Sequence, residues 1–267
     1  MLRTAVQVDG ETASYLTVRE DGPLVLLLHG TYWSRVWLPV LGQLATAGLR
    51  PVAVDFPGLG HSGGELTPKT ATVPALAAWV VRFLSALDIS SPVVVAGHDI
   101  GGAVAQHLLA HDRLEMSRLV LVNSVAYDSW PAPHVALFQH PDTTPDDLLA
   151  ARRQAVTRDL AEAATEQRIA DYLDPWTDPR VRRSWLAMVR AADSRYTLDL
   201  VPALRVSTVP KLLIWGEDDP FEKVEYAEKF ATEIPHTALR RIPRAAHIPT
   251  ENAPDQIARA LVDFVTA

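Results

Sequence analysis

The sequence alternates between short, continuously apolar runs and longer stretches with helical periodicity. An unbroken apolar run of four or five residues is typical of a strand that is buried on both faces of a sheet. The apolar runs are 24–28, 51–54, 93–96, 119–122 and 211–215, and the helical stretches among them are 33–47, 73–87 and 101–112. This alternation predicts an α/β fold with a mostly parallel sheet and helices on both faces.

The N-terminus has a different pattern. Two runs with alternating polarity, 4–8 and 13–18, flank the dipeptide Asp9-Gly10. An Asp-Gly pair between alternating runs is a strong hairpin signal, so we expect an antiparallel hairpin at one edge of the sheet.

The strand–helix alternation breaks between about 126 and 206. This segment contains seven prolines and two helix-like stretches, 145–172 and 181–192, but no obvious buried strand. It predicts a helical cap, 126–206, inserted after the sixth strand of a core made of 1–125 and 207–267.

The pattern then resumes with a strand, a helix over 224–234, a short strand over 238–242 and a helix over 253–264. A length of 267 residues fits one domain with such an insertion.

Composition excludes several classes of function. A net charge of −7 without a Lys/Arg cluster argues against nucleic acid or an anionic membrane as partners. The absence of cysteine excludes disulfides, thiolate metal sites and Cys nucleophiles. We expect no metal and no cofactor, since tandem His ligands are missing. No apolar run approaches the ~18 residues of a membrane span, and no signal-peptide pattern is visible, so a cytoplasmic location is expected.

The pentapeptide from Gly97 to Gly101 carries most of the chemical information. It lies between an apolar run and a helical stretch, which is the strand–turn–helix context of a nucleophile elbow. Glycines are expected on both sides of the central residue because a Cβ there would clash in the tight turn. The central residue is Asp99, whose carboxylate is ionised at neutral pH and is a nucleophile without a base. Attack on an alkyl carbon would give an ordinary ester, whereas attack on an acyl group would give a labile anhydride. The alternative is a solvated Asp in a βα turn.

Other polar residues follow the remaining strands, where open parallel sheets bind ligands. Asp219 follows the seventh predicted strand and His247 follows the eighth. The chain order Asp99, Asp219, His247 is that of a nucleophile, an acid and a base. Asp218 competes with Asp219 for the role of the acid.

These motifs together resemble the α/β-hydrolase fold, and more narrowly its aspartate-nucleophile branch of epoxide hydrolases, haloalkane dehalogenases and haloacetate dehalogenases. The matching segments are His29-Gly30, the turn 55–62, the elbow, Trp215-Gly216 with Asp219, and His247. The resemblance implies that Asp99 forms an alkyl ester and that His247, oriented by Asp219, activates water to hydrolyse it. It also implies an oxyanion hole formed by the backbone N–H groups of Thr31 and Ile100.

The leaving group is less constrained. Haloalkane dehalogenases carry Trp directly after the nucleophile and haloacetate dehalogenases carry Arg, but this chain has Ile100, which has no side-chain donor. The cap offers phenols that would suit an opening epoxide. We therefore expect opening of a C–O bond in a small, largely apolar substrate, with Tyr172 or Tyr196 as the proton donor. The residues expected to contact substrate are Tyr32, Trp33, Tyr127, Trp130, Tyr172 and Tyr196.

Other functions stay open. A dehalogenase could use Trp130, Trp176 or Trp185 as one halide donor. Hydrolysis of a carboxylic ester is disfavoured by Asp99, and a catalytically silent binding protein is disfavoured by the complete set of three residues. The expected partners are a small molecule and water, and the sequence leaves a monomer and a homodimer equally open.

Overall fold

A computed structural model describes residues 2–267 of the chain. Its strands form one sheet in the order β1-β2-β4-β3-β5-β6-β7-β8. The strands are β1 (Leu2–Val8), β2 (Glu11–Thr17), β3 (Leu24–Leu28), β4 (Arg50–Val54), β5 (Val93–Asp99), β6 (Met116–Ser124), β7 (Lys211–Gly216) and β8 (Thr237–Ile242). The hairpin β1–β2 and the pair β2–β4 are antiparallel, and all other neighbours are parallel. The predicted mostly parallel sheet with an antiparallel edge is confirmed.

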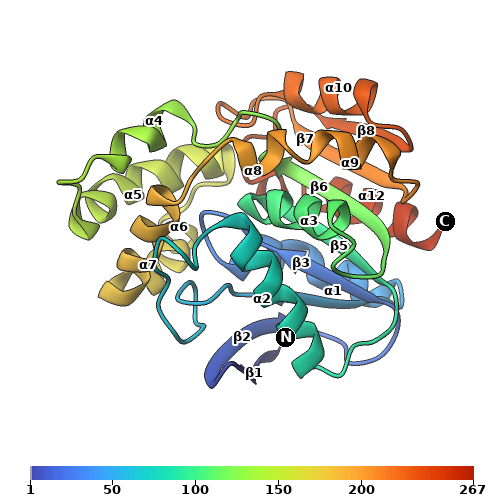
Figure 1. Cartoon of the computed structure of the whole chain (residues 1–267), viewed down its shortest axis with the longest axis horizontal. Coiled ribbons are helices and arrows are strands. Elements are labelled where there is room, and N and C mark those ends of the chain that lie inside the picture. The colour runs from blue at the N-terminus through green and yellow to red at the C-terminus, as the bar shows by residue number, and fades with distance from the viewer. Residues whose placement is uncertain (1) are drawn as a thin grey trace.

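Helices cover both faces of the sheet, as Figure 1 shows. The core helices are α1 (Leu38–Thr46), α2 (Val73–Ala86), α3 (Ile100–Ala110), α10 (Val224–Glu233), the short α11 (Pro249–Asn252) and α12 (Pro254–Thr266). One apolar core joins the sheet to α2, α3 and α10, and a second joins the opposite face to α1 and α12. The stretch 33–47, predicted as one helix, is divided into a 3-10 turn (Ser34–Trp37) and α1.

Between β6 and β7 the chain is helical. The helices are α4 (Pro133–Ala136), α5 (Pro145–Leu160), α6 (Glu166–Leu173), α7 (Pro179–Arg190), α8 (Arg195–Leu198) and α9 (Val201–Val206). Figure 1 shows α4 to α7 as a lobe at one end of the molecule, whereas α8 and α9 run back over the core beside α3. No helix of the described residues 2–267 is long and apolar enough to cross a membrane.

The lobe is tied to the core by hydrogen bonds at its base. Arg180 on α7 donates to the carbonyls of Ser62 and Gly64, at 2.8 Å each. Leu66 N–H donates to Ser184 Oγ at 3.0 Å. Both links reach the loop that follows β4, so this loop and the lobe hold each other in place.

Asp55, at the end of β4, organises that loop. Its buried carboxylate accepts hydrogen bonds from the backbone N–H groups of Ser34, at 2.8 Å, and His61, at 3.1 Å. Arg3 on β1 adds an ion pair at 3.2 Å. One side chain thus joins the hairpin, the start of the 3-10 turn and the loop after β4.

Replacing Asp55 with Asn is expected to lower the free energy of unfolding by about 2 kcal/mol, because an amide nitrogen would face backbone donors and the charge would be lost. Urea denaturation measures this change. The control is Asp9→Asn, which removes the exposed carboxylate partner of Arg82 and should change the free energy by less than about 0.5 kcal/mol. Equal effects of the two substitutions would contradict the proposed role of Asp55.

Candidate active site

Asp99 occupies a strained turn between β5 and α3. Its backbone has φ +53° and ψ −125°, a region that L-residues rarely adopt. A Cβ on Gly97 would collide with the backbone of Gly101 and Gly102, and one on Gly101 would collide with the carbonyls of Leu28 and His29. The turn therefore requires glycine at both flanking positions, as the sequence predicts for an elbow.

The two oxygens of the Asp99 carboxylate have different surroundings. Thr31 donates to Oδ2 twice, from its backbone N–H at 2.8 Å and from its hydroxyl. No residue in the described range 2–267 donates a hydrogen bond to Oδ1, and Asp99 lines the main cavity. Oδ2 is thus fixed in place, while Oδ1 is available to react.

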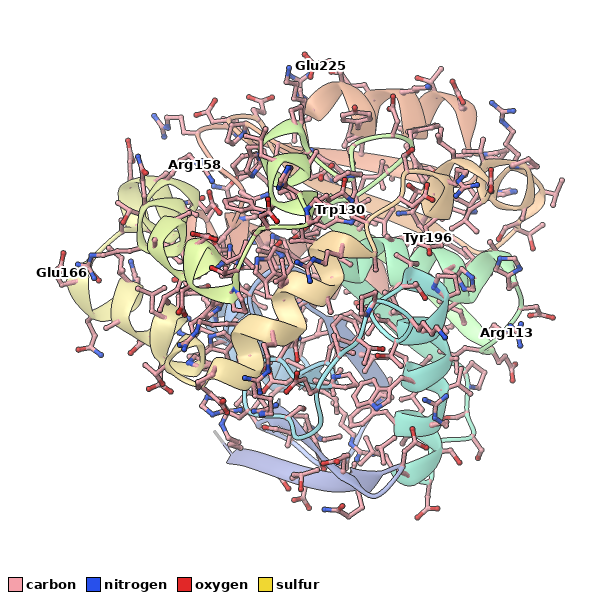
Figure 2. All side chains as sticks on the ribbon, turned by 60° about the vertical axis from the view of Figure 1, so that its left-hand side comes forward. Arg113, Trp130, Arg158, Glu166, Tyr196 and Glu225 are labelled. Atoms are coloured by element: carbon pink, nitrogen blue, oxygen red, sulfur yellow. The ribbon has the colours of Figure 1, made fainter. Side chains whose placement is uncertain are left out.

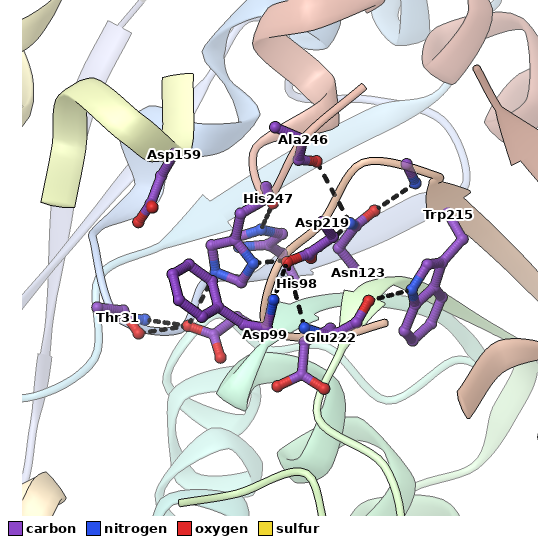
Figure 3. Close-up of polar contacts among 12 residues, drawn as sticks. Thr31, His98, Asp99, Asn123, Asp159, Trp215, Asp219, Glu222, Ala246 and His247 are labelled. Atoms are coloured by element: carbon purple, nitrogen blue, oxygen red, sulfur yellow. Dashed lines mark hydrogen bonds and ion pairs between the residues drawn. The ribbon is translucent and has the colours of Figure 1, made fainter. Parts of the chain in front are cut away.

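His247 and Asp219 complete the site, as Figure 3 shows. His247 Nδ1 lies 2.9 Å from Asp219 Oδ2, and Nε2 lies 3.8 Å from Asp99 Oδ2. All three side chains are buried. His98, inside the elbow, donates from Nε2 to the backbone carbonyl of His247 at 2.7 Å and so supports the His247 loop from below. The structure brings together the three residues that the sequence predicts as nucleophile, acid and base.

Asp219 is held by a set of donors. Asn123 Nδ2 donates to Oδ2 at 2.6 Å, and the N–H groups of Phe221 and Glu222 donate to Oδ1 at 2.8 and 3.2 Å. Asn123 also accepts a bond from Gly216 N–H at 2.8 Å, which links the ends of β6 and β7. Asp218, in contrast, is exposed. The acid that faces His247 is therefore Asp219.

The charges of the site stabilise one another. Burial alone would lower the pKa of His247, but Asp219 and Asp99 outweigh it and raise that pKa well above its ordinary value. Burial would likewise raise the pKa of Asp99, yet its interaction with His247 lowers the pKa well below the usual range. These shifts favour an imidazolium between two carboxylates as the resting state of the site.

A cavity of about 330 Å³ opens in front of Asp99 and His247. The lobe supplies most of its walls, from the segment before α4, from α5 and from α7, and the apolar lining includes Trp130, Leu148, Trp185 and Phe221. Figure 2 shows Trp130 in the interior among the side chains of the lobe. A cavity of this size with a largely apolar lining suits a small organic ligand.

Several residues that the sequence predicts as substrate contacts lie elsewhere. Tyr172 donates to Glu251 at 3.1 Å, and Tyr127 lies 3.4 Å from Glu233. Tyr196 packs against the core that contains α2 and α3, and Figure 2 shows it apart from Trp130. None of these phenols lines the cavity. The expectation that a cap tyrosine donates to the leaving oxygen therefore has no support from their positions.

Two residues of the loop after β3 also lie outside the cavity. Tyr32 is buried, donates to Asp159 at 2.5 Å and packs against Tyr172. Trp33 packs against His61 and beneath the Arg3 guanidinium. Of the six predicted contacts, Trp130 lines the cavity. Among the oxyanion residues, Thr31 contacts Asp99, and Ile100 begins α3 directly after it.

Three residues that line the cavity are not among the site residues predicted from the sequence. Arg152 is buried, donates to the Thr31 carbonyl at 2.9 Å and stacks 4.1 Å from the Trp176 ring centroid. Asp159 accepts from Tyr32 and pairs with Arg158 at 3.0 Å. Glu222 lies three residues after Asp219 and is buried in the cavity wall. Only Glu222 had a signal, its place in the loop after β7.

Comparisons with known proteins agree with this geometry. The chain belongs to the alpha/beta hydrolase family, whose model matches residues 25–260. It is 25% identical over 272 residues to the AB hydrolase superfamily protein YfhM of Bacillus subtilis, covering 92% of this chain and 91% of that protein. It is 28% identical over 304 residues to a haloalkane dehalogenase of Bradyrhizobium diazoefficiens, covering 99% and 94%. The crystal structure of the haloalkane dehalogenase DbeA from Bradyrhizobium elkani USDA94 superposes with a TM-score of 0.86 at 22% identity, covering 99% and 97%. The chain is thus an α/β-hydrolase with dehalogenase-like relatives.

The two adjacent acids provide a test of the site that is independent of any substrate. Asp219→Asn should lower the pKa of His247, because it removes the charge and the hydrogen bond that raise it. Asp218→Asn, at the exposed neighbour, should leave that pKa unchanged. Titration of the His247 ring by NMR measures both. A lowered pKa in Asp218→Asn alone would show that the assignment of the acid is wrong.

Proposed function

We propose that this hydrolase uses Asp99 to attack a saturated carbon of a small, largely apolar substrate and to open a C–O bond of the epoxide type. The observation that carries the proposal is the Asp99 carboxylate itself, with Oδ2 held by Thr31 and Oδ1 unbonded at the cavity. The dehalogenase relatives agree with an enzyme of this family but do not decide the bond that is broken.

In the first step, Oδ1 forms a bond to the substrate carbon, and the carbon–oxygen bond breaks with its electron pair on oxygen. Thr31 keeps the carboxylate in one orientation, so the attacking oxygen faces the cavity. The product is an alkyl ester of Asp99, with a hydroxyl group where the epoxide oxygen was.

The second step follows from the first through charge. The pKa of His247 is raised partly by Asp99. Once Asp99 is an ester, that negative charge is gone, so the pKa of His247 falls. The imidazolium then passes its Nε2 proton to the group that protonated the leaving oxygen, and the free Nε2 can act as a base. Nε2 then takes a proton from water that attacks the ester carbonyl carbon. Oδ2 becomes the oxyanion, and the Thr31 donors already point to it.

The lobe supports this chemistry by forming most of the walls of the cavity. A volume of about 330 Å³ is at the small end of the range for ligand pockets. Apolar walls favour a neutral substrate, and they limit the access of bulk water to the ester.

The cavity wall supports an epoxide oxygen as the leaving group. An opening epoxide needs a proton for its oxygen, and Glu222 is a buried carboxyl in that wall. A departing halide needs N–H donors instead, and Ile100 offers no side-chain donor at the position after the nucleophile.

Dehalogenation is the second candidate. Two indole side chains, Trp130 and Trp185, line the cavity with ring centroids 6.1 Å apart. Indole N–H groups are suitable halide donors, and relatives of this chain are named haloalkane dehalogenases. The same Asp99 ester would form, with halide rather than an alkoxide as the leaving group.

Trapping the ester tests the mechanism and the leaving group together. We expect His247→Gln to accumulate the Asp99 ester because no base remains to activate water. Styrene oxide should add its full mass to the protein, since ring opening loses no atoms, whereas 1-bromobutane would add its mass less hydrogen bromide. Intact-protein and peptide mass spectrometry at pH 8 measures the adduct and its position; at this pH, Asp99 stays ionised without the imidazolium.

The control for this experiment is His247→Gln/Asp99→Ala, which should form no adduct. An adduct on another residue, or none with either probe, would refute the proposed nucleophile. An adduct with 1-bromobutane alone would replace the epoxide assignment with dehalogenation.

A further inference from the structure

We propose that the carboxyl group of Glu222, in its neutral form, donates the proton that the leaving oxygen of the substrate takes up. This assigns to Glu222 the role that the sequence led us to expect of a cap tyrosine. The inference rests on the proposed C–O opening at Asp99.

The backbone of Glu222 is fixed to the catalytic acid. Its N–H donates to Asp219 Oδ1 at 3.2 Å, and its carbonyl accepts from Trp215 Nε1 at 2.6 Å. The side chain lines the same cavity as Asp99 and His247. Figure 3 shows its carboxyl group on the Asp99 side of this loop. The loop that orients His247 therefore also presents a carboxyl group to the substrate.

The carboxyl group is poorly placed to carry a charge. Glu222 is 2% exposed, and its Oε2 is buried without a hydrogen-bond partner anywhere in residues 2–267. A buried carboxylate with an oxygen that lacks a donor is disfavoured relative to the neutral acid. The neutral acid, by contrast, carries a proton that it can donate, and only its single O–H group needs a hydrogen-bond acceptor.

The surrounding charges act in the same direction. Asp99 and Asp219 face Glu222 with negative charge, and His247 provides a cation. Of the cations that the lobe brings to the cavity, Arg152 donates to Thr31 and Arg158 pairs with Asp159. His134 also lines the cavity, and burial lowers its pKa.

The balance of these effects keeps the acid protonated. Burial is the largest influence, and together with the two carboxylates it raises the pKa of Glu222 well above its ordinary value, against the opposing effects of Ser129 and His247. Glu222 is therefore the neutral member of a site whose other acids, Asp99 and Asp219, are paired with His247.

The proton transfer completes the first step. As Asp99 Oδ1 bonds to carbon and the C–O bond breaks, the oxygen takes the proton of Glu222 and becomes a hydroxyl group. Glu222 is left as a carboxylate. Alkyl halides expel halide without a proton, so they place no such demand on Glu222.

The test measures ester formation in the His247→Gln protein with and without Glu222→Gln. Styrene oxide should react about 100-fold more slowly when Glu222 is replaced, the scale of losing a general acid. Reaction with 1-bromobutane should keep its rate. The matched control is Glu225→Gln, the same substitution three residues along at an exposed position, which Figure 2 shows on the outer surface.

The pH profile separates proton donation from a packing role. With Glu222 present, the rate with styrene oxide should rise as Asp99 ionises and fall at higher pH as Glu222 loses its proton. Glu222→Gln should abolish the fall and keep the rise.

The possible outcomes distinguish proton donation from a packing role. Equal slowing with both probes would show that Glu222 only shapes the cavity, and an unchanged rate and pH profile with styrene oxide would refute proton donation. If styrene oxide gives no adduct even with Glu222 present, the proposed C–O opening fails, and the role of Glu222 fails with it.

Discussion

The site depends on one buried charge arrangement, an imidazolium held between two carboxylates. An isolated buried charge is costly, and burial is the largest influence on both Asp99 and His247. The arrangement is stable because each charge faces its counterpart and because Asp219 accepts bonds from Asn123, Phe221 and Glu222. The ends of β5, β6, β7 and β8 must therefore keep their register, since each contributes one part of this arrangement.

The site also requires the backbone of the loop after β3 to approach the Asp99 carboxylate closely. A Cβ on Gly30 would collide with the Asp99 carboxylate, so glycine here lets the loop after β3 bring the Thr31 donors to Oδ2. Arg152 then fixes this loop from the lobe side by donating to the Thr31 carbonyl. The lobe is thus a structural support of the nucleophile as well as a cover for it.

Strands, and the residues at their ends, depend on local sequence pattern and are predicted well from the sequence. Continuous apolar runs place the strands, and the strand ends then bring Asp99, Asp219 and His247 together irrespective of their distance in the chain. The sequence predicts poorly which way a side chain of the lobe points. Tyr172 lies on α6, but the rotation and tilt of that helix direct its phenol to Glu251 rather than to the cavity. Its phenol is held by segments far apart in the chain, since Arg35 lies over the Tyr172 ring and also pairs with Glu251. Glu222 was missed for a different reason: its importance comes from burial without a partner, which spacing does not reveal.

The proposed roles of His247 and Glu222 form a closed proton cycle. When Asp99 becomes an ester and Glu222 gives up its proton, the site holds an imidazolium, a new carboxylate and one negative charge fewer at Asp99. Return of the imidazolium proton to Glu222 restores the neutral acid, which the buried position of that carboxyl group favours, and leaves His247 as the base that the second step needs. Water then delivers one proton to His247, and its remaining O–H hydrogen leaves with the product as the ester collapses. The site returns to an imidazolium between two carboxylates with Glu222 neutral, so that one water is consumed and no proton is drawn from bulk solvent. A single buried site can therefore protonate the leaving oxygen and then activate water. Forming the ester removes the charge of Asp99, and this changes the proton affinity of both Glu222 and His247.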